Sequence, residues 1–422
     1  MFENPIRLMR RLPPQVRLLI AGTFLNKLGT FILPYLTLVL TRDFGMTGSQ
    51  AGTLVMAYGI GSLVSILVGG FLTDLLGRRL TLMLSLLGSG TLGVAMGLAP
   101  SVRVFVPLLW LFGFLADLYR PASSAIIGDL LPSRDRATGF AALRTAVNLG
   151  FAAGMGIGGL LVDWSWRVLF VADGLTTALF GVTVYFFIQE TRPPEAARTP
   201  SRAEGRHSTL GLAQDRVYAS LMVSSLAYSI VVFVFITVLP LTVTLSAGYP
   251  AAVYGAIVGI NGVLIGVFEI SVVAWLKRFR RLRVAALGMV VSGVGFALTG
   301  ASMHWTWLLF TVVIWTLGEI LTVPQQMSFV ADWAPPEARG RYLGLYGATW
   351  SVGIALNPIL LLPLHARLGE RGFWPLMLLI LAPAALIPWK LDAAADHPER
   401  LRGLSGGPSD EAVILPSLSP EA

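Results

Sequence analysis

The sequence contains no cysteine, which excludes disulfide bonds, thiolate metal sites and thiol nucleophiles. Histidine is almost as scarce: the four present, His207, His304, His365 and His397, fall in predicted loops or tails, which excludes a histidine proton relay inside a membrane. Charged residues make up only 13% of the 422 residues, whereas soluble proteins carry about 25%. With 55% hydrophobic residues and a mean hydropathy of +0.72, the chain is predicted to be an integral membrane protein.

Apolar runs of about 20 residues, long enough to cross a bilayer core as a helix, occur twelve times. They lie near 16–41, 49–73, 80–99, 103–129, 139–162, 167–188, 217–246, 251–276, 284–303, 306–331, 341–363 and 372–390. We therefore expect an all-α membrane protein of twelve transmembrane helices. The expected parts are a six-helix bundle at 1–188, a cytoplasmic linker at 189–216, a second bundle at 217–390 and a disordered cytoplasmic tail at 391–422.

The distribution of Lys and Arg predicts the orientation, because these residues stay on the cytoplasmic side of short loops. With the N-terminus inside, few of the 31 basic residues fall in outside loops: Arg42, Arg103, Arg167, Arg367 and Arg371. Both termini are thus expected in the cytoplasm and the chain in the inner (plasma) membrane. The net charge of +8 reflects basic clusters next to the membrane, which attract anionic lipid and indicate no nucleic-acid partner.

The two halves of the chain share a repeat with an offset of 203 residues. Pro121, Asp129, Pro132 and Arg136 recur as Pro324, Asp332, Pro335 and Arg339. A parallel repeat in an apolar chain is typical of transporters whose two bundles enclose a substrate site near the middle of the membrane. No cofactor fingerprint, metal-ligand cluster or nucleophile–base set is evident, so neither an enzyme nor a cofactor is expected.

The loop between the second and third spans holds an acid and two arginines around a glycine turn. Its residues are Gly70, Asp74, Gly77, Arg78 and Arg79. They resemble the cytoplasmic signature of the major facilitator superfamily, G-x-x-x-D-[RK]-x-G-R-[RK], with Leu75 in place of a basic residue. The resemblance implies that Asp74 stabilises the outward-facing state at the N-terminus of span eleven, and that Arg78 pairs with Asp129. In the second half, Lys277 and Arg280 replace Asp74 and Gly77, so this motif is not expected to repeat.

Glycines four residues apart line one face of span five, where they allow a neighbouring helix to approach closely. They are Gly150, Gly154, Gly158 and Gly159. The segment resembles the antiporter motif of the superfamily's drug:proton antiporters, G-x-x-x-G-P-x-x-G-G, with Met155 in place of proline. The repeat carries the proline in the other half as Pro358. Generic packing of a glycine-rich membrane helix is the alternative interpretation.

Ionisable residues inside the predicted spans need a partner or a water-filled cavity, because a charge at the bilayer centre costs about 2.5–3.5 kcal/mol. In the first half they are Lys27, Asp117, Arg120, Arg144 and Asp173. Asp117 and Arg120 are one helical turn apart and can pair, and Arg144 is expected to share their cluster. The bases outnumber the acids, so a cavity wall there would be positive. Asp173 is expected to be structural. Asn26 and Asn148 are further cavity candidates.

The second half carries two acids in its spans, Glu269 and Glu319, and no base within a span. Glu319 and Asp117 are almost equivalent in the repeat. Glu319 is the leading candidate for proton coupling, followed by Glu269 and Asp117, because a carboxyl without a counter-charge can exchange a proton. Trp315, Tyr346 and Trp350 are expected to supply apolar and cation–π surface beside it. Alternatively, Glu319 or Glu269 binds Asn261 or a backbone carbonyl and stays structural.

We therefore expect a monomeric secondary transporter that uses a proton gradient to export amphipathic or drug-like small molecules by alternating access. The alternatives are a proton-coupled importer of a nutrient or anionic metabolite, favoured if Lys27, Arg120 and Arg144 bind an anion, and a lipid or glycolipid transporter. A non-transporting receptor on the same fold is disfavoured, because no sizeable polar domain follows the spans. The fold hosts many chemistries, so its resemblance alone names no substrate.

Overall fold

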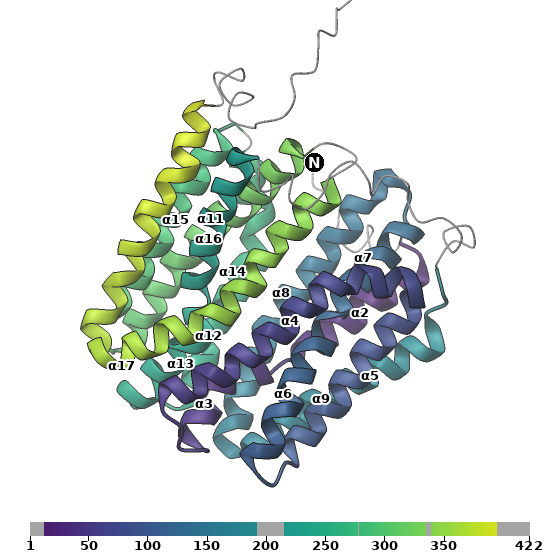
Figure 1. Ribbon diagram of the computed structural model, residues 1–422, viewed down its shortest axis with the longest axis horizontal. Coiled ribbons are helices and arrows are strands. Elements are labelled where there is room, and N and C mark those ends of the chain that lie inside the picture. The colour runs from purple at the N-terminus through teal and green to yellow at the C-terminus, as the bar shows by residue number, and fades with distance from the viewer. Residues whose placement is uncertain (1–11, 192–214, 277, 335–338, 395–422) are drawn as a thin grey trace, which may run out of the picture.

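The computed structural model describes residues 12–191, 215–276, 278–334 and 339–394, and the residues so described form helices without any strand. Most of the predicted linker 189–216 and tail 391–422 lie outside the described residues, as does Lys277. Figure 1 shows the helices as two bundles side by side, the first in purple and blue, the second in teal to yellow.

Within residues 12–191, the first bundle comprises eight helices that correspond to six predicted spans. They are α2 (Pro14–Leu28), α3 (Ile32–Arg42), α4 (Gly48–Leu76), α5 (Arg78–Gly97), α6 (Val102–Asp117), α7 (Tyr119–Leu130), α8 (Ser133–Trp164) and α9 (Trp166–Phe187). Spans one and four are thus each built from two helices. Asp173 explains the break in span one, because its carboxylate accepts the backbone N–H groups of Phe31 and Ile32 at 2.9 and 2.8 Å.

The second bundle begins with an interrupted span, in which short helices follow α11 (Arg216–Val232). They are α12 (Val234–Thr237), α13 (Leu239–Leu241) and a π-helical turn at Thr242–Ser246. Pro240 lies inside this stretch and lacks the N–H that a regular helix needs. The bundle continues with α14 (Ala251–Leu276), α15 (Arg281–Thr299), α16 (Trp305–Trp333) and α17 (Arg339–Ala394).

The described helices account for the predicted spans. Ten segments are long and apolar enough to cross a membrane, and the bent helix at 48–76 makes an eleventh. One of the ten, Tyr342–Asp392, has 51 residues, about 76 Å of helix, which is more than twice the thickness of a bilayer core. It reverses at Gly369, whose φ of 62° is left-handed, between the predicted spans 341–363 and 372–390.

Two large helix contacts join the bundles, α4 with α17 and α8 with α14, and α3 adds smaller contacts with α12 and α13. Figure 1 shows α4 and α17 running side by side along the boundary. We call the end of the molecule where the described chain begins and finishes the terminal end, and the opposite end the far end. The described chain finishes at the yellow end of α17, near the top of Figure 1.

The bundles are tightly joined at the far end. One hydrophobic cluster there includes Tyr35 and Tyr58 from the first bundle and Tyr254 and Ile354 from the second. The rings of Tyr35 and Tyr254 meet edge to face at 5.4 Å, and the Tyr254 hydroxyl donates to the carbonyl of Pro34 at 3.2 Å. A single core therefore closes the boundary at this end.

A polar contact at the far end also joins the bundles. The Asp163 carboxylate, at the end of α8, accepts the backbone N–H of Ala252 in α14 at 3.2 Å. Its other oxygen lies 3.1 Å from the Arg42 guanidinium. A carboxylate at a helix N-terminus is electrostatically favourable, so this contact reinforces the closed far end.

The terminal end lacks such a shared core. Two separate clusters lie there, one entirely within the first bundle around Leu19, Ile126 and Val184, and one within the second around Tyr218 and Val330. A methyl group on Gly70 of α4, or on Gly344 or Gly347 of α17, would meet nothing within 4 Å. The bundles are therefore packed together at the far end and separated at the terminal end.

This packing predicts that Gly159 is needed to close the far end. A methyl group on Gly159 would lie 2.6 Å from the Cα of Ala252, whereas one on Gly156 meets nothing within 4 Å. We expect Gly159→Leu to force the far end open and Gly156→Leu to leave it closed. Because the chain has no cysteine, one cysteine at the cavity residue Thr30 can report accessibility to an impermeant maleimide from the far side. Equal labelling in both variants would contradict this role of Gly159.

Candidate functional site

A cavity of about 600 Å³ lies between the bundles. All eight described helices of the first bundle, α2 to α9, contribute to its lining, and the second bundle adds Phe233, Phe235, Ile236 and Met327. A smaller cavity of about 440 Å³ adjoins it and shares Phe140, Arg144, Asn148 and Met327. The combined space has the size and mixed apolar and polar lining of small-molecule sites.

The break in the first span positions two candidate residues in this cavity. Asp173 on α9 caps α3, and Thr177, one turn further along α9, accepts a hydrogen bond from the Asn26 amide at 2.8 Å. Asn26 and Lys27 therefore sit on the last turn of α2, beside the break, and both line the cavity. The expectation that Asp173 is structural agrees with these contacts.

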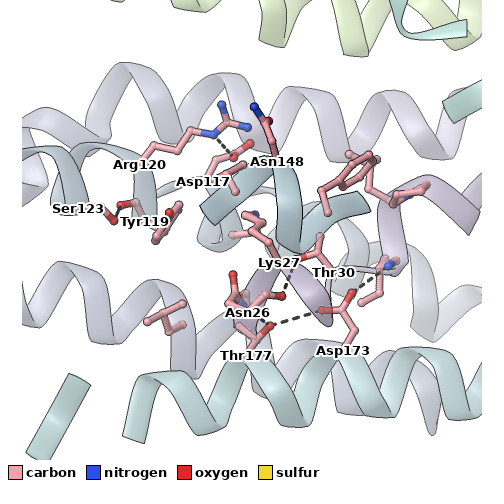
Figure 2. Close-up of a pocket in the computed structure, with 18 of the residues that line it drawn as sticks. Asn26, Lys27, Thr30, Asp117, Tyr119, Arg120, Ser123, Asn148, Asp173 and Thr177 are labelled. Carbon is pink, nitrogen blue, oxygen red and sulfur yellow. Dashed lines mark hydrogen bonds and ion pairs between the residues drawn. The ribbon is translucent and has the colours of Figure 1, made fainter. Parts of the chain in front are cut away.

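The Lys27 ammonium points into the cavity (Figure 2). Its Nζ lies 5.5 Å from the centre of the Tyr119 ring, a cation–π distance. Within the described part of the chain, no carboxylate forms an ion pair with Lys27. This cation therefore has an aromatic ring as its neighbour, without a counter-ion.

Asp117 and Arg120 form the ion pair that their spacing predicts. Arg120 Nε lies 2.8 Å from Asp117, and the Ser62 hydroxyl donates to the other carboxylate oxygen. Ser62 also lies 3.5 Å from Ser351 of the second bundle. Asp117 is thus held from α4 as well as from its own span, close to the boundary between the bundles.

Arg144 does not join that pair, contrary to expectation. It binds Glu269 of α14 instead, in an ion pair that crosses between the bundles. The Glu269 side chain is 11% exposed and that of Arg144 46% exposed. The sequence could not reveal this pairing, because the two residues are 125 positions apart and only the packing of α8 on α14 brings them together.

Glu319 lies on α16 and accepts a hydrogen bond from the Asn261 amide at 3.1 Å. The same amide donates to Thr316 at 3.1 Å. Among the described residues, no Lys or Arg forms an ion pair with Glu319, and Glu319 does not line the two cavities. Glu319 therefore makes the hydrogen bond to Asn261 that is expected if its role is structural.

The three aromatic residues expected beside Glu319 are core residues. Trp315 is buried and stacks between Phe235 and Phe296, with ring centres at 5.8 and 5.2 Å. Tyr346 and Trp350 belong to the hydrophobic packing of the second bundle at the terminal end. None of the three lines either cavity. Their expected role as apolar and cation–π surface for the substrate therefore stays a prediction.

The glycines of span five serve two different interfaces. A methyl group on Gly150 or Gly154 would meet the backbone of α2, at 2.6 and 2.7 Å. Gly158 is covered by Phe31 and Tyr35 of the first bundle, and only Gly159 faces the second bundle. Most of the motif therefore packs α8 against the broken first span, and its last residue closes the far end.

The charged motif at the terminal end contains the predicted contact between Arg78 and Asp129, at 3.1 Å. Arg78 also lies 3.0 Å from Asp74, whose side chain is 75% exposed. Gly77 has a φ of 96°, so this turn requires glycine. The bundles are apart at this end, and among the described residues Asp74 forms no hydrogen bond or ion pair with α17.

Two features of this motif escaped sequence reasoning. Glu190 caps α5 by accepting the backbone N–H groups of Arg78 and Arg79 at 3.0 and 3.1 Å. In the second half, Arg281 binds Asp332, and these residues follow Arg78 and Asp129 by the same offset of 203. The motif is therefore only partly lost from the second half, and its Arg–Asp pair survives. Testing the repeat offset on every charged residue could have found this pair.

Comparisons with known proteins agree with this architecture. The sequence profile of the Major Facilitator Superfamily matches residues 19–358 and 221–400. A Na(+), Li(+), K(+)/H(+) antiporter of Planococcus maritimus is 24% identical over 382 residues, which cover 83% of this chain and 89% of the antiporter. The quinolone resistance protein NorA of Staphylococcus aureus is 25% identical over 350 residues, which cover 82% of this chain and 88% of NorA.

Solved structures share the fold at lower identity. A POT family transporter in complex with 5-aminolevulinic acid superposes with a TM-score of 0.76 at 15% identity, covering 91% of this chain and 99% of that chain. A D-xylose-proton symporter superposes with a TM-score of 0.72 at 17% identity, covering 89% and 97%. The arrangement of helices is therefore common to proteins with very different cargoes.

The ion pair between the bundles generates a prediction by charge reversal. Arg144→Glu and Glu269→Arg should each place like charges together and lower the thermal unfolding midpoint of the purified protein, and the double variant should recover most of the loss. Because Arg144 is 46% exposed, we expect a coupling energy of about 1 kcal/mol, toward the lower end of contacting pairs. Additive losses in the double variant would show that the two side chains do not interact.

Proposed function

The chain belongs to the major facilitator superfamily, and we propose that it is a proton-coupled exporter of amphipathic organic molecules. Its relatives include a cation/proton antiporter and a quinolone resistance protein, which supports exchange and export. The cavity has room for a drug-sized molecule and is lined by aromatic rings such as Phe112, Phe151 and Phe235. No cofactor is proposed, and the proton gradient supplies the energy.

We further propose that the chain lies in the plasma membrane with both termini in the cytoplasm, as the distribution of Lys and Arg supports. The terminal end then faces the cytoplasm, and the separation of the bundles there corresponds to an inward-facing state. Loading from the cytoplasm, followed by closure of the terminal end and opening of the far end, would export the substrate. One chain supplies both sides of the cavity, which supports a monomer as the functional unit.

The observation that carries proton coupling is the environment of Glu319. Its carboxyl contacts an amide, at 3.1 Å, and no cation among the described residues forms an ion pair with it. Such a carboxyl can gain and lose a proton without breaking an ion pair. Asp117 and Glu269, by contrast, are each bound to an arginine. Glu319 is therefore the preferred proton carrier, and protonation would change its bond to Asn261 on the neighbouring α14.

Import is the second candidate function, and Lys27 is the observation that favours it, because an unpaired cation in the cavity suits an anionic nutrient. The direction of transport separates the two candidates. Net extrusion against a substrate gradient would support export. Accumulation inside the cell that depends on the proton gradient would support import.

We expect cells that express the wild-type chain to accumulate less of a fluorescent amphipathic dye than cells without it. A protonophore should abolish this difference. The Glu319→Gln substitution, which keeps the shape but removes the titratable group, should reduce extrusion at least about tenfold, since proton transfer by one positioned group typically contributes 10²–10⁴-fold. Dye fluorescence in washed cells is the measurement.

The matched control is Asp43→Asn, the same chemical change in an acid outside the cavity. Asp43 pairs only with Arg42 among the described residues, and such surface pairs contribute little. It should extrude dye like the wild type. Extrusion that resists the protonophore would rule out proton coupling. Extrusion that needs the gradient but survives Glu319→Gln would assign coupling to another group.

A further inference from the structure

The charged side chains around the cavity are engaged by protein partners, with one exception. Arg120 is bound by Asp117, Arg144 is bound by Glu269, and the Asp173 carboxylate is occupied by two backbone N–H groups. Lys27 alone among the described cationic residues that line the cavity has no ion-pair partner. Of the positive wall expected from the sequence, one ammonium group is therefore left without an ion pair.

Figure 2 shows where this ammonium lies. Lys27 projects between the Asp117–Arg120 pair on one side and Asn26, Thr30 and Asp173 on the other. Asn26 is engaged by Thr177, and Thr30 donates to the backbone carbonyl of Asn26. Asn26 and Thr30 are uncharged. Asp117 and Asp173 attract Lys27 electrostatically, but among the described residues neither forms an ion pair with it. The space in front of the ammonium is the cavity itself.

Placing a cation inside a membrane protein without an ion-pair partner costs free energy, because lipid and apolar side chains cannot solvate it as water does. The cation–π contact with Tyr119 offsets only part of this cost. An anionic group on a ligand would complete the site with a charge-assisted hydrogen bond. An anionic ligand would thus lower the electrostatic cost of Lys27 by forming the ion pair that the protein does not supply.

The rest of the lining limits what that ligand can be. Tyr58, Phe112 and Phe151 from the first bundle and Phe233 and Phe235 from the second offer ring surface around the same space. Asn148 also lines it, and its side-chain amide makes no hydrogen bond within the described residues. A ligand that binds both the Lys27 ammonium and the aromatic lining has an apolar, ring-containing body and one anionic group.

We propose that Lys27 binds a carboxylate or similar anionic group of the transported substrate, so that the substrates are amphipathic organic acids or zwitterions rather than permanent cations. This inference rests on the proposed function and names the chemistry of its substrate. It assigns Lys27 a role in specificity that is separate from the proton-carrying role of Glu319. The two residues belong to different bundles, so substrate recognition and proton binding use opposite sides of the molecule.

The test compares two probes with one body and different charge. A fluoroquinolone carboxylic acid and its methyl ester are titrated into the purified full-length chain in detergent, and binding is followed by calorimetry. We expect the wild type to bind the acid at least about tenfold more tightly than the ester, as for a hydrogen bond to a charged group. Lys27→Met should abolish the preference by weakening acid binding alone, and Lys27→Arg should retain it.

Two controls keep the result interpretable. Lys390→Met makes the same change in an exposed lysine at the end of α17 and should bind like the wild type. Unchanged ester binding by Lys27→Met shows that its cavity is intact. The proposal is overturned if the wild type binds the ester as well as the acid, fails to bind the acid, or keeps its preference in Lys27→Met. Binding needs no proton gradient, so dye extrusion through Glu319 could fail or succeed independently of this outcome.

Discussion

Most of the site geometry depends on one interaction, the capping of α3 by Asp173. The hydrocarbon core offers no water, so a backbone break inside a membrane must be satisfied by the protein. Asp173 does this with two hydrogen bonds to Phe31 and Ile32. The break ends α2 at Leu28, and this places Asn26 and Lys27 at the cavity. Without the cap, the backbone N–H groups of Phe31 and Ile32 would lose these partners inside the protein.

Two kinds of contact hold the bundles together. At the far end, small residues allow backbone contact, as between Gly159 and Ala252 or Gly59 and Ala355. Deeper in the boundary, the contact becomes ionic between Arg144 and Glu269. Dispersion forces at the far end and charge pairing near the cavity thus hold one interface. A transporter must exchange both sets of contacts when it changes state, and the Arg–Asp pairs at the terminal end are confined within single bundles.

The terminal end shows how far the internal repeat extends. Arg78–Asp129 and Arg281–Asp332 are equivalent pairs, and each fixes the loop between two spans of its own bundle. Asp74 has no equivalent acid in the second half, where the repeat offset leads to Lys277. The pairs within bundles are therefore duplicated, whereas the residue that the family resemblance assigns to the contact between bundles is present once. The contact that the resemblance assigns to Asp74 would therefore be made by the first bundle alone.

The sequence by itself determined the class of fold, the repeat, the approximate spans and local pairs such as Asp117–Arg120, because these depend on composition, hydrophobic length and spacing along one helix. Only the tertiary structure decided which helix Asp173 caps, that Arg144 binds Glu269, and that Trp315 is buried in a stack of rings. These outcomes depend on the rotation of each helix and on contacts between different helices, up to 142 residues apart in the chain, which no local pattern records. That is why the sequence offered three cavity cations, and the packing left one, Lys27, without an ion-pair partner among the described residues.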